Sequence, residues 1–129
     1  MVVDTSALLA ILLGEADAPA IADAMAKAPV RRISAVSWLE AAIVITSRRG
    51  ERGADALREL LARLRAEIVP VDYAQAQAAY GAWLAYGKGR NAAALNFGDC
   101  FAYAAAKRLG EPLLFKGEDL AKTDVRRAL

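Results

Sequence analysis

Short apolar runs alternate with longer segments of helical periodicity along the whole chain. The runs have the length of buried strands and occupy residues 1–5, 30–33, 68–71 and 112–115. The segments between them have helical spacing of their apolar residues and span residues 6–13, 17–27, 34–49, 54–64, 73–86 and 97–109. Strands that alternate with helices form parallel sheets covered on both faces. The pattern therefore predicts an α/β fold with a central parallel sheet of four to five short strands.

Capping side chains and glycines mark the expected ends of these helices. Ser6 is expected to cap the first helix, and Asp72 the helix that follows the third apolar run. Gly110 is expected to end the last long helix. Gly50 and Gly53 are expected to bracket a turn that separates two helices in the middle of the chain.

The length of 129 residues predicts one domain, over residues 1–129. Hydrophobic residues make up 57% of the chain, against about 45–50% in a typical protein, so a core is amply supplied. No apolar run approaches the ~18 residues that a membrane span needs. Asp4 precedes the first apolar helix, where a signal peptide would carry basic residues. We therefore expect a cytoplasmic protein with no membrane association.

The residue types that are scarce exclude several kinds of chemistry. The chain has one cysteine, Cys100, and no histidine. Internal disulfides, zinc sites with several cysteines and catalysis by a histidine-containing triad are therefore excluded. The net charge of +2 does not by itself indicate a nucleic-acid-binding protein. Catalysis, if present, must use carboxylates, hydroxyls, lysines, arginines or a metal ion bound by oxygen atoms.

Three acidic residues from distant segments are expected to meet at one edge of the sheet. Asp4 ends the first strand, Glu40 lies near the start of a helix that follows a strand, and Asp99 lies in the first turn of another helix. Ligands of open α/β sheets bind beyond the carboxyl ends of the strands. Carboxylates placed this close repel one another unless a cation neutralises them, and Mg²⁺ or Mn²⁺ accepts such oxygen ligands.

Each acid also has an ordinary structural interpretation. Asp4 could cap the end of a strand, and Asp99 could be a helix N-terminal acid stabilised by the helix dipole. Asp119 lies in a polar tail, where solvated acids are the rule. Glu40 is harder to explain in this way, because Trp38 and Leu39 precede it on an otherwise apolar helix.

Three segments resemble the VapC toxins of the PIN-domain family, in the right order and at the right spacing. They are Val2-Val3-Asp4-Thr5-Ser6-Ala7-Leu8, the stretch from Leu95 to Ala104 around Asn96-Phe97-Gly98-Asp99-Cys100, and Leu113-Leu114-Phe115-Lys116-Gly117. The resemblance implies a three-layer α/β/α sandwich and a Mg²⁺-dependent endoribonuclease, the toxin of a type II toxin–antitoxin system. It places the catalytic acids on Asp4, Glu40 and Asp99, with Asp4 and Asp99 as the metal ligands and Mn²⁺ as a possible substitute ion.

The chain departs from the family pattern at two positions. Many relatives carry a fourth acid directly after the last strand, where this chain has Gly117 followed by Glu118 and Asp119. We expect Asp119 to take that role. Relatives often have a histidine where this chain has Asn91, which leaves the role of that position in RNA binding open.

Two other functions stay open from the sequence: a non-catalytic interaction module on the same fold, and, more remotely, an aspartyl-phosphate receiver. An RNA substrate would need a basic rim around the acids. The candidate basic residues are Arg48, Arg49, Arg52, Lys88, Arg90 and Lys116. The resemblance, together with more apolar bulk than one small sheet can cover, predicts a homodimer and a groove for a VapB-type antitoxin. The residues concerned are Trp38, Ile43, Tyr80, Trp83 and Tyr86.

Overall fold

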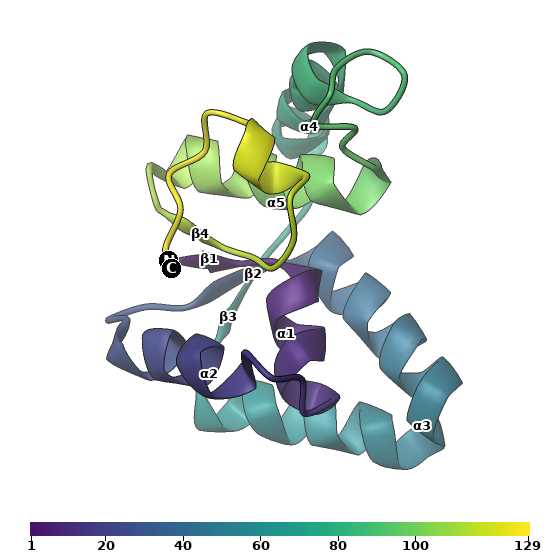
Figure 1. Cartoon of the computed structure of the whole chain (residues 1–129), viewed down its shortest axis with the longest axis vertical. Coiled ribbons are helices and arrows are strands. Elements are labelled where there is room, and N and C mark those ends of the chain that lie inside the picture. Colours follow the sequence, from purple (N-terminus) through teal and green to yellow (C-terminus); the bar gives the residue numbers. More distant parts are fainter.

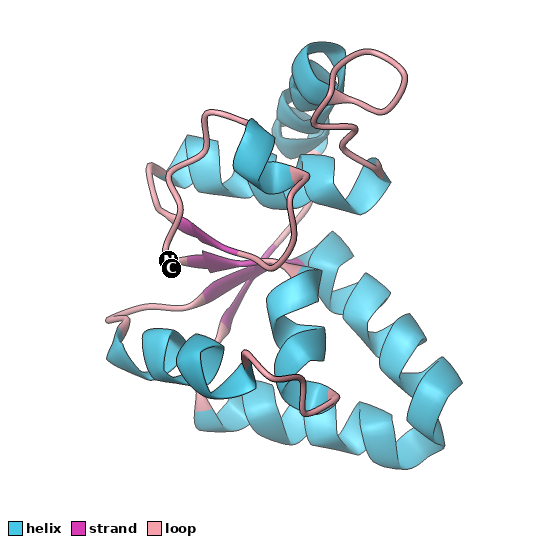
Figure 2. Cartoon of the chain, viewed as in Figure 1, coloured by secondary structure: helices cyan, strands magenta, loops and turns pink.

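The computed structural model describes all 129 residues and has a four-stranded parallel sheet at its centre (Figure 2). The strands are β1 (Val2–Val3), β2 (Arg32–Ser34), β3 (Glu67–Val69) and β4 (Leu113–Leu114). Their order is β3-β2-β1-β4, and every neighbouring pair is parallel. The strands are short, and the sheet fits the expected range of four to five.

Helices cover both faces of this sheet (Figure 1). They are α1 (Thr5–Leu12), α2 (Ala18–Lys27), α3 (Ala35–Arg63), α4 (Tyr73–Tyr86) and α5 (Phe97–Leu109), followed by the short 3₁₀ helix η1 (Leu120–Lys122). Helices α1, α2 and α3 lie on one face, whereas α4, α5 and the C-terminal segment lie on the other. The predicted three-layer α/β/α sandwich is confirmed.

Successive strand residues point to opposite faces of the sheet, and this alternation divides the core in two. Val2 and Leu113 belong to a buried cluster shared with α4 and α5. Val3 and Leu114 belong to a second cluster shared with α1, α2 and α3. In β1 and β4 both residues are apolar because one side chain packs into each core, as the alternation of side chains along a strand requires.

Helix α3 bends at a single glycine. Gly50 has φ +63° and ψ −157°, and the two halves of α3 run in different directions from it (Figure 1). The prediction that Gly50 and Gly53 bracket a turn is wrong for Gly53, which stays helical and buried. A β-carbon at Gly53 would lie 2.9 Å from Cγ1 of Ile45, so this glycine permits close packing inside the bend.

The other predicted element ends are mostly correct. Asp72 caps α4 by accepting a hydrogen bond from the Gln75 amide at 2.8 Å, and Gly110 ends α5 in the left-handed conformation. The third strand ends at Val69, before Pro70, because proline has no amide hydrogen for the ladder. The predicted cap of the first helix was wrong, since Asp4 and not Ser6 occupies that position. No helix in the structure combines the length and the apolar character that a membrane span requires.

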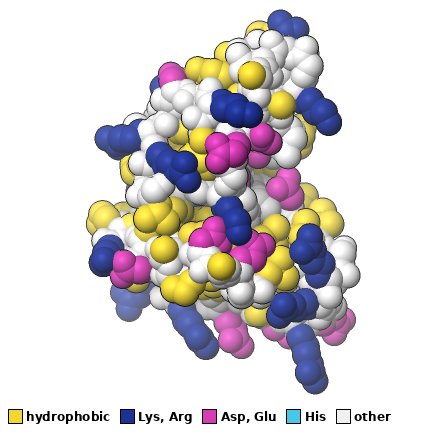
Figure 3. Space-filling model, viewed as in Figure 1, with side chains coloured by type: hydrophobic (Ala, Val, Ile, Leu, Met, Phe, Trp, Pro, Cys, Tyr) yellow, Lys and Arg dark blue, Asp and Glu magenta, His cyan; other side chains and the backbone are white.

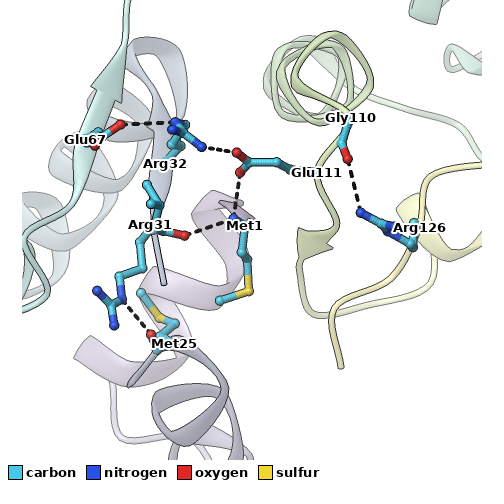
Figure 4. Close-up of polar contacts among 9 residues, drawn as sticks. Met1, Met25, Arg31, Arg32, Glu67, Gly110, Glu111 and Arg126 are labelled. Atoms are coloured by element: carbon cyan, nitrogen blue, oxygen red, sulfur yellow. Dashed lines mark hydrogen bonds and ion pairs between the residues drawn. The ribbon is translucent and has the colours of Figure 1, made fainter. Parts of the chain in front are cut away.

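Ion pairs tie together the amino ends of the strands (Figure 4). The Glu111 carboxylate, just before β4, pairs with the Met1 ammonium at 2.6 Å and with Arg32 of β2. Arg32 also reaches Glu67 of β3 at 3.1 Å. One network thus links all four strands at this edge, and the candidate acids lie at the opposite edge.

Candidate active site

Asp4 follows β1 directly and serves as the N-cap of α1. Its Oδ2 atom accepts hydrogen bonds from the Ser6 amide at 2.9 Å and from the Ser6 hydroxyl at 2.6 Å. The side chain is buried, and both of these hydrogen bonds go to Oδ2. Asp4 thus caps α1 through Oδ2 and not through Oδ1.

In Asp99, as in Asp4, the hydrogen bonding of the carboxylate goes through one oxygen, Oδ2. It forms a capping box at the start of α5, in which Asn96 Oδ1 accepts from the Asp99 amide at 2.9 Å and Asp99 Oδ2 accepts from the Asn96 amide at 3.0 Å. The capping box fixes the carboxylate through one oxygen and leaves Oδ1 without a hydrogen-bond partner. Asn96 therefore anchors the loop that precedes α5.

Glu40 approaches the other acids from α3. Its carboxyl group lies against Gly98 of α5, where a β-carbon would come within 3.1 Å of Glu40 Cδ and closer still to Oε2. The Thr5 hydroxyl donates to the Ser37 carbonyl oxygen at 3.2 Å and so joins the start of α1 to α3. Only a residue without a side chain at position 98 leaves room for this carboxylate.

A polar pocket of about 150 Å³ lies where these elements meet. Its lining includes Asp4 and Asp99, and the segment after β4 adds further acids. The residues that line it are Asp4, Ser6, Asn96, Asp99, Lys116, Gly117, Glu118, Asp119 and Leu120. Asp119 therefore lies at the pocket and not in a separate polar tail, and Glu118 lies beside it. Glu40 is not among the lining residues, but its charge is close enough to raise the pKa of Asp99.

The electrostatics of the pocket reflect burial and repulsion between acids. The pKa of Asp99 is raised to about 6, mainly by burial and in part by the charges of Asp4, Asp119 and Glu40, against the opposing hydrogen bond from Asn96. Burial also raises the pKa of Asp4, although the bonds from Ser6 oppose this. The pKa of Glu40 is raised by partial burial and by the Asp4 charge, against the effect of the Thr5 hydroxyl. A bound cation would stabilise the charged form of all three carboxylates and so lower their pKa values.

The donor atoms of the pocket suit a hard cation. No group of three His, Cys, Asp or Glu side chains is arranged to hold a metal ion by itself. Mg²⁺ needs no such cage, because it keeps several waters and binds through one or two carboxylates. Asp4 and Asp99 each contribute a carboxylate to this pocket, so the residues present fit such an ion.

One of the six basic residues expected around the acids, Lys116, lines the pocket. Lys116 is the only basic residue that lines the pocket. The Arg90 guanidinium instead lies over the Trp83 ring, 4.9 Å from its centroid. The face drawn in Figure 3 shows acidic side chains gathered at mid-height, with basic side chains beside them.

The contacts of two residues at the site, Gly98 and Lys116, were not predicted from the sequence. Gly98 carries a weak signal, since a glycine in the first turn of a helix suggests close approach of another group. The contacts of Lys116 carry no sequence signal, because its partners Glu15 and Asp17 are about 100 residues away.

Comparisons with known proteins agree with this architecture. The PIN domain family model matches residues 1–126. The Ribonuclease VapC of Mycolicibacterium smegmatis is 55% identical over 125 residues, which are 97% of this chain and 97% of that protein.

Two solved structures have the same fold. VapC20 of Mycobacterium tuberculosis, a toxin that cleaves the sarcin–ricin loop, superposes with a TM-score of 0.79 at 21% identity, over 96% of this chain and 95% of its own. A toxin–antitoxin complex from Klebsiella pneumoniae gives a TM-score of 0.71 at 19% identity, over 95% of this chain and 92% of the matched chain. The family match and the 55% identity confirm the resemblance found in the sequence. The chain belongs to the PIN-domain family and, within it, to the VapC group.

Proposed function

We propose that this chain is a Mg²⁺-dependent endoribonuclease that acts as the toxin of a type II toxin–antitoxin system. The observation that carries the proposal is the convergence of Asp4, Asp99 and Asp119 on one polar pocket, with Glu40 close enough to raise the pKa of Asp99. Helix capping explains the hydrogen bonds of Asp4 and Asp99, but not why the two carboxylates line the same pocket. The ribonuclease activity named for the 55% identical relative supports the same function.

Asp4 and Asp99 would hold the ion, with Mn²⁺ as a possible substitute. When bound, the ion supplies charge neutralisation at the scissile phosphate and lowers the pKa of a bound water. The Ser6 and Asn96 hydrogen bonds hold the two carboxylates in place before substrate binds. Such preorganisation lowers the cost of reaching the transition state.

Glu40 and Asp119 have a different task in this proposal. Glu40 lies against Gly98, and its raised pKa suits a group that accepts a proton from the attacking water. Asp119 comes from the segment after β4 and also lines the pocket. It would orient water or substrate, in the place of the fourth acid that many relatives carry directly after the last strand.

Two separate apolar surfaces support two protein partners. One is the groove of about 440 Å³ between α4 and α5, whose seven lining residues are all hydrophobic and include Tyr80, Trp83 and Phe97. The other lies on α3, where Trp38, Leu39 and Ile43 are exposed. We assign the α4–α5 groove to a homodimer and the α3 surface to an amphipathic helix of a VapB-type antitoxin. Tyr86, by contrast, packs against the core.

The test is metal-titrated cleavage of RNA by the purified chain. We expect cleavage with Mg²⁺ or Mn²⁺, none in EDTA, and recovery when excess Mg²⁺ is returned. Cleavage that continues unchanged in EDTA would contradict the metal, and failure to cleave total cellular RNA with either ion would contradict the enzyme.

A further inference from the structure

Lys116 is the single positive charge in the wall of the acidic pocket. The charged residues around it in the lining are Asp4, Asp99, Glu118 and Asp119. Proteins bind RNA largely by pairing its phosphates with Lys and Arg, and a wall of acids repels phosphate. The position of this one ammonium group therefore bears directly on how substrate is held.

The backbone of Lys116 is fixed within the site. Its amide donates to the Ser6 hydroxyl oxygen at 2.9 Å, and that hydroxyl in turn donates to Asp4 Oδ2 at 2.6 Å. Only two hydrogen bonds thus separate the Lys116 main chain from the Asp4 carboxylate. Gly117 then turns the chain with φ +103°, so Lys116 is the last residue before the segment folds over the pocket.

The side chain of Lys116 is held at the rim by acids outside the pocket. Its ammonium pairs with the Glu15 carboxylate and, at 3.0 Å, with Asp17 Oδ1. Both acids lie between α1 and α2, and neither lines the pocket. All three side chains are about 40% exposed, and ion pairs with this exposure are weak. A phosphate group can therefore compete for the ammonium.

We propose that Lys116 binds a backbone phosphate of the RNA beside the acidic pocket, and that Glu15 and Asp17 compete with RNA for this lysine. The inference rests on the proposed function, because it assigns a substrate contact at the same site. Lys116 acts as a positioning residue: its four-carbon side chain carries the charge from a backbone anchored to Asp4 toward the phosphate next to the one being cleaved. The α1–α2 acids lower RNA affinity by occupying the ammonium in the free protein.

The experiment measures binding of a labelled single-stranded RNA oligonucleotide, in EDTA so that the probe stays intact, over a range of salt concentrations. One phosphate contact contributes about 0.7 to the slope of log K against log salt for single strands, which is about fivefold in affinity at ~0.1 M salt. Lys116→Met should reduce the slope by about 0.7 and the affinity by about fivefold, whereas Lys116→Arg should keep the wild-type slope and affinity. The double variant Glu15→Gln/Asp17→Asn should bind RNA more tightly, and this gain should vanish when Lys116→Met is added.

Matched controls separate this effect from a change in net charge. Asp23 and Glu59 also pair with basic residues on exposed helical surfaces, Lys27 and Arg63, away from the pocket. The double variant Asp23→Asn/Glu59→Gln makes the same charge change, and any gain it gives should be unaffected by Lys116→Met. Thermal melts of each variant check the fold.

The outcomes distinguish this inference from the proposed function. If the wild type cleaves RNA with Mg²⁺ but Lys116→Met binds RNA with the wild-type salt slope, the phosphate contact is wrong and the ribonuclease stands. If the gain from Glu15→Gln/Asp17→Asn is the same with and without Lys116, the competition is wrong. If the wild type neither binds nor cleaves RNA, both proposals fail.

Discussion

Glu40 of α3 lies in direct contact with Gly98 of α5, where a β-carbon at position 98 would come within 3.1 Å of the Glu40 Cδ atom. This contact joins the long helix of one layer to the first turn of a helix in the other layer. Asp99 follows Gly98 immediately, so the same backbone turn positions two of the four acids.

Replacing Gly98 by alanine should therefore lower activity without unfolding the protein. Alanine favours the helix by about 1 kcal/mol over glycine, but its methyl group would push the Glu40 carboxylate out of place. We expect kcat for RNA cleavage to fall by roughly tenfold to a hundredfold, since the proposed proton acceptor would be misaligned. Steady-state cleavage and thermal melting on the same preparation measure both effects.

Gly81 provides the matched control for that substitution. It lies inside α4, and a β-carbon there would meet no atom within 4 Å. Gly81→Ala should raise the free energy of unfolding by about 0.5–1 kcal/mol and leave cleavage unchanged. Full activity in Gly98→Ala would mean that the position of Glu40 is unimportant.

The two roles of Asp4 can be separated by two substitutions. In Asp4→Asn the amide oxygen can still cap α1, so the fold should be retained while RNA cleavage is lost. In Asp4→Ala the cap is lost as well, which should cost about 1 kcal/mol of stability beyond Asp4→Asn. Chemical denaturation compares the two variants. Equal stability of both would show that the hydrogen bonds from Ser6 contribute little to α1.

The sequence predicted the layers and the meeting of Asp4 and Asp99, because both follow from local patterns. Alternating apolar runs and helical segments determine the sandwich, and Asp4 and Asp99 lie at predictable ends of elements. It did not predict that Asp4 caps α1, since Ser6 is an equally good capping residue and only the geometry decides between them. It could not show that Glu15 and Asp17 hold Lys116, because pairing across about 100 residues leaves no local pattern.

The metal-free protein should become less stable as the pH rises from 5 to 7. The pKa of Asp99 is raised from 3.8 to about 6 in the folded state, mainly by burial. A raised pKa stabilises the fold while the carboxyl is protonated, and this contribution is lost as the pH rises through the folded-state pKa. The raised pKa values of Asp4 and Glu40 act in the same direction.

Denaturation in EDTA at both pH values measures this effect. The Asp99 contribution should be roughly 1 kcal/mol after allowance for solvent screening of its part-exposed carboxyl. The chain has no histidine, whose ordinary pKa would fall in this window. Asp99→Asn should weaken the dependence, and saturating Mg²⁺ should remove most of it in the wild type. If the stability of the wild type in EDTA rises from pH 5 to 7, and Asp99→Asn shows the same pH dependence, the raised pKa of Asp99 is contradicted.

Tyr80 offers a test of the proposed homodimer. Its ring stacks with Trp83 at a centroid distance of 6.1 Å in the apolar groove, and 61% of the residue is exposed. Tyr80→Ser should shift the chain toward monomer in light scattering at micromolar concentration, because it removes apolar area from the assigned interface. Tyr73→Ser is the control, since Tyr73 is also exposed on α4, at 78%, but does not line the groove. A wild type that is wholly monomeric would contradict the homodimer.

Cleavage of RNA by Asp99→Asn is the most direct test of the central claim, that the converging acids form a metal-dependent ribonuclease site. Asparagine can still accept the Asn96 hydrogen bond, so the capping box and the fold should persist while a charged oxygen is lost from the pocket. With equal protein, RNA and Mg²⁺, the account predicts cleavage by the wild type and loss of cleavage by Asp99→Asn, at a melting temperature in EDTA that is equal or higher. Cleavage by Asp99→Asn at the wild-type rate would contradict it.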